Sequence, residues 1–207
     1  PCVESVKQNT ISRENFIKKN NIDSEKLIFS IFPGSRQQEL NYLLPLFLET
    51  VEEFCKDKKT LLPIISVSSP KYKKKILASL KRFKKTSIKI YEADSIQLIQ
   101  HSHIILSSSG TITLETALQG IPSVVAYKFH PITYWFAKTF FSNKVNRIKY
   151  ISLPNLMLNK KVMPEFLQKD ANVINLLDQL NRLLDQSNRN KIKHQLSKLK
   201  TKLEIEN

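Results

Sequence analysis

The chain has 207 residues, enough for one large or two small domains with a sizeable core. Its hydrophobic fraction of 41% favours a globular protein, and no apolar stretch reaches the ~18 residues of a membrane-spanning helix, which argues against a transmembrane class. Its net charge of +15 indicates an anionic partner, unless a composition rich in Lys, Asn and Ile is the source of the charge.

Residues 1–26 are polar, and we expect them to form a lead-in segment with a short helix that continues from a missing N-terminal domain. Beyond them, short apolar runs alternate with helical patterns. Strands are predicted at 27–32, 62–68, 87–92, 103–109 and 123–129, with 150–153 as a further candidate. Helices are predicted between them at 38–56, 71–85, 95–101, 111–119 and 132–142. This alternation predicts an α/β fold, a Rossmann-like parallel sheet with helices on both faces.

Two further helices, at 172–185 and 188–204, are predicted without a strand between them. We therefore divide the chain into a Rossmann-like domain at 27–170 and C-terminal helices at 171–207. The lysine-rich tail is expected to form an exposed helix or a helix that needs a partner surface absent from this chain.

Two segments have compositions that are typical of a contact surface. The segment 71–85 places apolar residues on one helical face and Lys and Arg on the other, so it either covers one side of the sheet or lies on an anionic membrane. The run from Tyr127 to Phe141 is rich in aromatic residues, which favour a membrane or acyl-chain contact, a dimer surface or a core position.

Gly34 lies between an apolar strand pattern and a helical pattern, in a chain with only three glycines. In an α/β sheet such a turn presents free backbone N–H groups and the positive end of a helix dipole. Ser35 is predicted to cap the helix in a capping box with Gln38. Arg36 adds a planar cation suited to phosphate oxygens. The turn therefore predicts an anion site, or else an ordinary helix cap beside a surface arginine.

A second turn of the same kind lies at Gly110, again between a strand pattern and a helical pattern. Ser109 and Thr111 add hydroxyl groups beside it, and two such turns that face one crevice would hold a diphosphate. Glu115 follows one turn into the helix, where the dipole favours a carboxylate. Because a carboxylate repels a phosphate, a ribose hydroxyl is its expected ligand, as in dinucleotide folds.

The sequence lacks other common motifs of catalysis and cofactor binding. A P-loop pattern, G-x-G-x-x-G and G-x-S-x-G are all absent. Two lone cysteines and four scattered histidines have no metal-ligand spacing, so we expect neither a metal nor a cofactor. The two cysteines also fit a reducing, cytoplasmic setting.

The chain contains three separated motifs in a fixed order: FPGSRQQEL (32–40), SSSGTITLETALQGIPSVVAYKFHPITYWFAK (107–138) and YISLPNLMLNKKVMPEFLQ (150–168). Together they resemble the C-terminal half of the lipid-A-disaccharide synthase family, whose members are glycosyltransferases with two Rossmann-like domains, the GT-B fold. The resemblance implies transfer of 2,3-diacylglucosamine from UDP to 2,3-diacylglucosamine 1-phosphate with release of UDP.

The resemblance also implies roles for individual residues. Gly34, Ser35 and Arg36 would contact the diphosphate, with Arg36 acting in catalysis. Ser109, Gly110 and Thr111 would contribute at the second turn, and Glu115 would hold the ribose. Asn155 in SLPN would be a polar catalytic residue, or else simply an Asn that ends a strand. The general base of the family is a carboxylate of the N-terminal half, so this chain alone is expected to bind nucleotide weakly and not to catalyse.

The expected partners are UDP-diacylglucosamine, a lipid acceptor, the N-terminal domain, the anionic inner face of the inner membrane and a second copy in a homodimer. Two other functions remain open. One is another UDP-sugar enzyme of the same architecture, such as a sugar-nucleotide epimerase. The other is a basic nucleic-acid-binding module. The basic residues form no RNA- or DNA-reading motif, which argues against this alternative, so we expect no nucleic acid as a partner.

Overall fold

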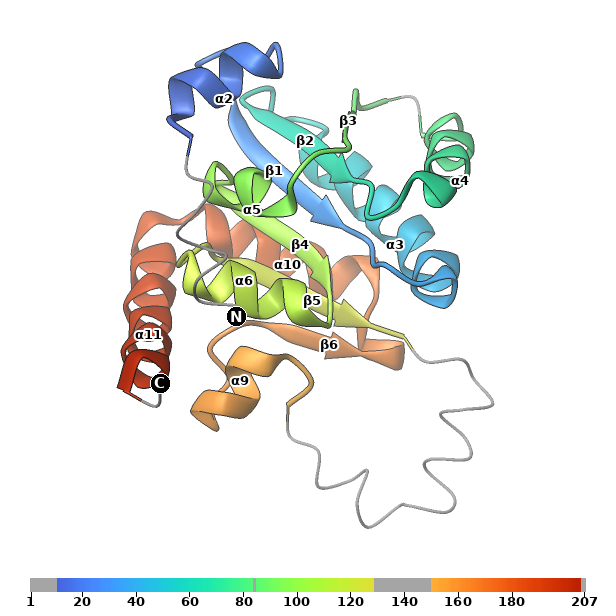
Figure 1. The fold of residues 1–207 in the computed structure, drawn as a ribbon. Coiled ribbons are helices and arrows are strands. Elements are labelled where there is room, and N and C mark those ends of the chain that lie inside the picture. Colours follow the sequence, from blue (N-terminus) through green and yellow to red (C-terminus); the bar gives the residue numbers. More distant parts are fainter. Residues whose placement is uncertain (1–10, 84, 129–149, 206–207) are drawn as a thin grey trace.

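A computed structural model describes residues 11–83, 85–128 and 150–205. Six parallel strands form one sheet in the order β3-β2-β1-β4-β5-β6 (Figure 1). The strands are β1 (Leu27–Phe32), β2 (Leu61–Ser66), β3 (Lys89–Tyr91), β4 (Ile104–Ser108), β5 (Ser123–Tyr127) and β6 (Glu165–Leu167). The predicted α/β fold is confirmed.

The central strand β1 is buried on both sides because its apolar side chains alternate between two cores. Phe29 and Ile31 pack into one hydrophobic cluster, whereas Ile28 and Phe32 pack into the cluster on the opposite face. A side-chain period of two directs neighbouring residues to opposite faces, so a continuous apolar run fits a strand covered on both sides.

Three helices share the larger cluster on one face of the sheet: α3 (Gln37–Cys55), α4 (Pro70–Leu80) and α10 (Val173–Leu184). In α10, Leu176, Leu180 and Leu183 recur at helical spacing and are buried. In α4, Tyr72 and Ile76 are buried in the same cluster, which supports the prediction that this basic amphipathic segment covers the sheet.

The other face is covered by α2 (Arg13–Lys19), α5 (Ser95–Gln100), α6 (Thr111–Leu118) and α11 (Gln186–Ile205). Within the lead-in segment, Phe16 of α2 is fully buried beside Tyr91 and His101. In α11, Leu196 and Leu199 are fully buried in a cluster with Ala117 of α6. The prediction that the partner surface of the lysine-rich tail is absent from the chain is therefore wrong, because the chain itself covers Leu196 and Leu199.

The predicted strand at 150–153 is wrong. Ser152 is the N-cap of a short helix, α9 (Leu153–Leu158), and Pro154 lies in its first turn, where proline is favoured. The sixth strand is instead β6, which pairs with β5 and continues into a 3₁₀ helix, Gln168–Asp170. Its three residues are too few to show a periodic pattern in the sequence.

Some predictions concern residues that the structure does not describe. The helix predicted at 132–142 lies outside the described residues, as do residues 129–141 of the aromatic run and residues 1–10 of the lead-in segment. Within the described ranges, none of the helices combines the length and the apolar character needed to cross a bilayer.

His103, which directly precedes β4, is a partly buried histidine with cationic side chains around it. Burial and the charges of Arg189, Lys193 and Arg13 lower the pKa of its imidazole from 6.5 to about 4. Below pH 6.5 the unfolded chain therefore binds more protons than the folded chain, and stability is lost as the pH falls towards 4. We expect the His103→Gln variant to lose about 1 kcal/mol less between pH 7 and pH 5 than the unaltered chain, in urea unfolding.

The exposed His194 of α11 offers a matched control. Burial also lowers the pKa of His101, so the His103→Gln variant should keep part of the pH dependence. The His194→Gln variant shows how the loss of an exposed histidine alters the same unfolding curves. Equal pH dependence in the His103→Gln variant would contradict the assignment.

Candidate functional site: a cleft at the switch point of the sheet

The two glycine turns lie side by side because of the strand order. β1 and β4 are neighbours at the centre of the sheet, with Phe32 paired to Ser107 near their carboxyl ends. The helix that follows β1 packs on one face of the sheet and the helix that follows β4 packs on the other. Such a switch point leaves a crevice at the carboxyl ends of the strands, where open α/β sheets bind ligands.

A cleft of about 640 Å³ occupies this position. Its lining includes Gly34–Arg36 from the first turn, Ser109–Thr111 from the second turn and Glu115 from α6. The carboxyl ends of β2 and β3 and the segments that follow them contribute residues 66–70 and Glu92, Ala93 and Ser95. The lining also includes Glu39 of α3 and Ile151 and Leu153 of the SLPN segment. The prediction that the two glycine turns face one shared crevice is confirmed.

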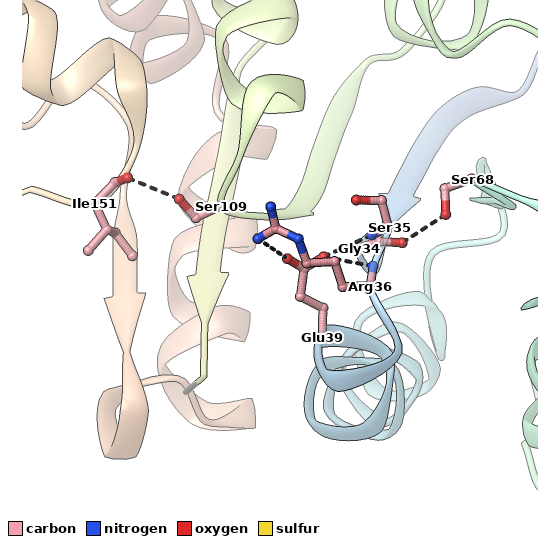
Figure 2. Close-up of polar contacts among 7 residues, drawn as sticks. All are labelled: Gly34, Ser35, Arg36, Glu39, Ser68, Ser109 and Ile151. Atoms are coloured by element: carbon pink, nitrogen blue, oxygen red, sulfur yellow. Dashed lines mark hydrogen bonds and ion pairs between the residues drawn. The ribbon is translucent and has the colours of Figure 1, made fainter. Parts of the chain in front are cut away.

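The Gly110 turn is open to the cleft. Gly110 has φ +149°, and no heavy atom lies within 4 Å of the position that a Cβ would take. α6 begins at the next residue, so its first backbone N–H groups and the positive end of its dipole lie at the cleft. The Ser109 hydroxyl donates to the Ile151 carbonyl (3.0 Å), which ties this turn to the SLPN segment (Figure 2).

The Gly34 turn is built differently from the prediction. The N-cap of α3 is Arg36, and the residue that reaches back to the turn is Glu39. Its Oε2 accepts hydrogen bonds from the backbone N–H groups of Ser35 (2.8 Å) and Arg36 (3.3 Å), as Figure 2 shows. The predicted capping box of Ser35 and Gln38 is therefore wrong by one residue. The Ser68 hydroxyl, after β2, donates to the Gly34 carbonyl (3.1 Å).

Glu115 lies in the cleft with an unusual carboxyl group. Burial, and secondarily the charge of Asp94, raise the pKa of its carboxyl above the ordinary value. Its Oε2 is buried and has no hydrogen-bond partner among the described residues. A buried acceptor without a partner is costly, so a hydroxyl group of a ligand would satisfy it.

Asn155 lies away from the lining of the cleft. Its side chain is fully buried within α9, where Oδ1 accepts from the backbone N–H groups of Val162 (2.7 Å) and Met163 (2.9 Å). Its Nδ2 donates to the Met163 carbonyl (2.8 Å). Asn155 therefore fixes the segment before β6, and it neither ends a strand nor contacts the cleft in this structure.

Three polar residues near the cleft were missed by the sequence analysis: Glu39, Ser68 and Glu165. The carboxylate of Glu165 accepts from the backbone N–H groups of Ile151 (3.1 Å) and Ser152 (2.8 Å), next to the contact with Ser109. A signal existed for Glu39, because a glutamate three residues after an N-cap is the second half of a capping box. Ser68 and Glu165 act across long sequence separations, which local patterns do not report.

The strand order, the layers and the cleft define a Rossmann-like domain of the kind found in GT-B glycosyltransferases. The C-terminal domain of a glycosyltransferase from Francisella tularensis has the same fold, with a TM-score of 0.62, 17% identity and coverage of 96% of this chain and 95% of that domain. A UDP-GlcNAc 2-epimerase from Neisseria meningitidis, solved with UDP-GlcNAc, has a TM-score of 0.59 and 17% identity, with coverage of 100% and 52%.

The sequence identifies the family more narrowly. A family described as Lipid-A-disaccharide synthetase matches residues 1–207. Lipid-A-disaccharide synthase from Coxiella burnetii is 34% identical over 179 residues, which cover 86% of this chain. The chain belongs to the lipid-A-disaccharide synthase family. It spans about half the length of the relatives that it matches, since the aligned part is 45% of the Coxiella protein.

Proposed function

We propose that this chain is the donor-binding part of a lipid-A-disaccharide synthase. The complete enzyme would transfer 2,3-diacylglucosamine from UDP to 2,3-diacylglucosamine 1-phosphate and release UDP. The observation that carries the proposal is the single cleft into which both glycine turns and Glu115 open. The chain's membership of the lipid-A-disaccharide synthase family, which acts in lipid A biosynthesis, supports the proposal.

UDP fits the chemistry of this cleft. We place its diphosphate between the Gly34–Arg36 and Ser109–Thr111 turns, where the Arg36 guanidinium and the amides that open α6 supply positive charge. Glu115 lies further into α6, and its unpartnered oxygen would accept hydrogen bonds from the ribose hydroxyls. The Neisseria epimerase, which has the same fold, is a protein solved with a UDP-sugar.

The same groups would assist the reaction. When the bond between C1 of the sugar and the β-phosphate oxygen breaks, its electron pair goes to UDP, which gains negative charge. Arg36 and the α6 amides would stabilise that charge, as preorganised donors do at other sites of charge development. The acceptor 6-oxygen would form the new bond to C1 as a general base takes its proton. We place that base in the part of the relatives' sequence that this chain does not cover.

The first test is binding of UDP to the 207-residue chain by calorimetry or ligand-observed NMR. We expect weak binding, and the Arg36→Ala variant should bind UDP about tenfold less tightly, because a lost charge-assisted hydrogen bond is worth about 1.5 kcal/mol or more. The matched control is Arg182→Ala, because Arg182 lies exposed on α10 and its side chain pairs only with Asp178 among the described residues. Equal binding by the Arg36→Ala variant, or no binding of UDP by the unaltered chain, would contradict the proposal.

An epimerase is the second candidate, because the Neisseria protein shares the fold. Its identity of 17% carries the fold alone, whereas the synthase relatives are twice as similar in sequence. The two functions differ in their need for a lipid acceptor. In a complete protein, consumption of UDP-diacylglucosamine without an acceptor would favour the epimerase.

The substrates suggest where the protein works. We propose that it acts at the cytoplasmic, anionic face of the inner membrane, where diacylated sugars are held. The exposed lysines of α4, Lys71, Lys73 and Lys74, lie on the helix whose N-terminus adjoins the cleft, and the neighbouring Leu77 is 41% exposed. We also propose that the protein forms a homodimer and that its N-terminal half docks against this domain.

A further inference from the structure

The Gly34 turn already holds an anion of its own. Glu39 is a carboxylate with a side chain only 8% exposed, and its Oε2 accepts from the N–H groups of both Ser35 and Arg36. These are the two backbone donors that a phosphate would otherwise use at this turn. Charge-assisted hydrogen bonds of this kind are the strong ones, so the turn is held firmly.

Gly34 itself is explained by this carboxylate. A Cβ at Gly34 would lie 2.4 Å from Oε2 and 2.5 Å from Cβ of Glu39, distances that real Cβ atoms do not show. The equivalent position at Gly110 has no neighbour within 4 Å. One turn is therefore filled by the protein, whereas the other leaves room for a ligand to approach the backbone.

The cation of the turn is left facing outwards. The Arg36 side chain is 78% exposed and lines the cleft, and its Nη1 lies 3.7 Å from Oε1 of Glu39. Glu39 is anchored by the two backbone contacts, so it limits the positions that the long arginine side chain takes (Figure 2). A third contact, from the Ser68 hydroxyl to the Gly34 carbonyl, holds the same turn from the β2 side.

We propose that Glu39 is a positioning residue for the nucleotide site, an inference that rests on the proposed function. It keeps the Ser35 and Arg36 amides engaged when nucleotide is bound, so the Gly34 turn contributes the Arg36 side chain to the diphosphate and the Gly110 turn contributes the backbone amides. The competing interpretation is that Glu39 is a placeholder, which the diphosphate displaces from the two amides.

The two interpretations predict opposite signs for the Glu39→Ala variant. Removal of a placeholder takes away a negative charge that competes with phosphate, so UDP would bind more tightly. Removal of a positioning residue loosens the turn and Arg36, so we expect UDP to bind about tenfold less tightly. The Glu39→Gln variant should fall between, because its amide oxygen keeps one acceptor. Glu49→Gln, at an exposed position of the same helix, is the matched control.

A double-mutant cycle separates positioning from a general loss of structure. If Glu39 acts through Arg36, its replacement should cost little further UDP affinity in an Arg36→Ala background. A loss that persists undiminished in that background would overturn the proposal, as would tighter binding by Glu39→Ala. Urea unfolding of each variant shows whether it is folded. If Glu39→Ala is unfolded, the cycle is measured with Glu39→Gln instead.

NMR of the unaltered chain gives a readout that needs no variant. On titration with UDP, the amide signals of Gly110, Thr111 and Ile112 should move, whereas those of Ser35 and Arg36 should keep their hydrogen-exchange protection. Loss of that protection on binding would show displacement of Glu39 and overturn the proposal. If no signal moves, UDP does not bind and the proposed function fails. The hydrogen-exchange protection of the Ser35 and Arg36 amides in the chain without nucleotide then still tests whether Glu39 accepts from them.

Discussion

Gly34→Ala should destabilise the chain by about 3 to 5 kcal/mol in urea unfolding, the sum of a strained backbone and an overpacked site. Gly34 has φ +119°, a backbone angle that L-residues with a side chain rarely adopt. The new methyl group would also occupy the space of the Glu39 carboxylate. Since Glu39 would have to leave, the Ser35 and Arg36 amides would lose their acceptor as well.

The other two glycines are matched controls because they share the positive φ without the collision. Gly110 has φ +149° and Gly120 has φ +66°, and a Cβ added at either position would have no neighbour within 4 Å. Alanine at Gly120 should cost about 1 kcal/mol, the usual penalty for the left-handed conformation. If Gly34→Ala costs no more than Gly110→Ala, the contact with Glu39 is not what holds the turn. Adding Glu39→Gly, which removes the Cβ of Glu39 as well as its carboxylate, should recover part of the loss.

The glycines show how far local sequence patterns reach. Parallel strands with alternating helices were predictable from apolar runs, and the strand order then brought Gly34 and Gly110 to one cleft. The pattern did not distinguish their roles, since both glycines lie between a strand and a helix. Only the packing of Glu39 shows that one turn is filled and the other is open. The contact of Glu39 with the Ser35 and Arg36 amides is local, but a capping-box pattern does not show how closely the carboxylate packs against the glycine turn.

The SLPN segment was misjudged for a related reason. Tyr150 and Ile151 have high strand propensity, but Ser152 and Pro154 are helix-start residues, and the start signal prevailed. The role predicted for Asn155 came from a resemblance, and a resemblance does not specify the contacts of a side chain. In the structure its hydrogen bonds run to the segment before β6, where Glu165 holds Ile151 and Ile151 holds Ser109. Its influence on the cleft would therefore be indirect.

Asn155→Leu should destabilise the chain by about 3 to 5 kcal/mol, because each buried polar group left without a partner costs about 1 to 3 kcal/mol. The substitution leaves the N–H group and the carbonyl of Met163 without their partner, whereas the Val162 N–H keeps a second acceptor in the Lys160 carbonyl (2.9 Å). Val162 and Met163 are both buried, so water cannot replace the lost contacts without local opening. Urea unfolding of the variant measures the loss directly.

Asn15→Leu is the control, because Asn15 is exposed on α2 and its change should alter stability by less than about 0.5 kcal/mol. A purely catalytic Asn155 predicts the reverse of our expectation, namely an Asn155→Leu chain as stable as the unaltered one. Asn155→Asp adds a further distinction. It keeps an acceptor for the two N–H groups but turns a carboxylate oxygen towards the Met163 carbonyl, so its stability should fall as rising pH ionises the new carboxyl group.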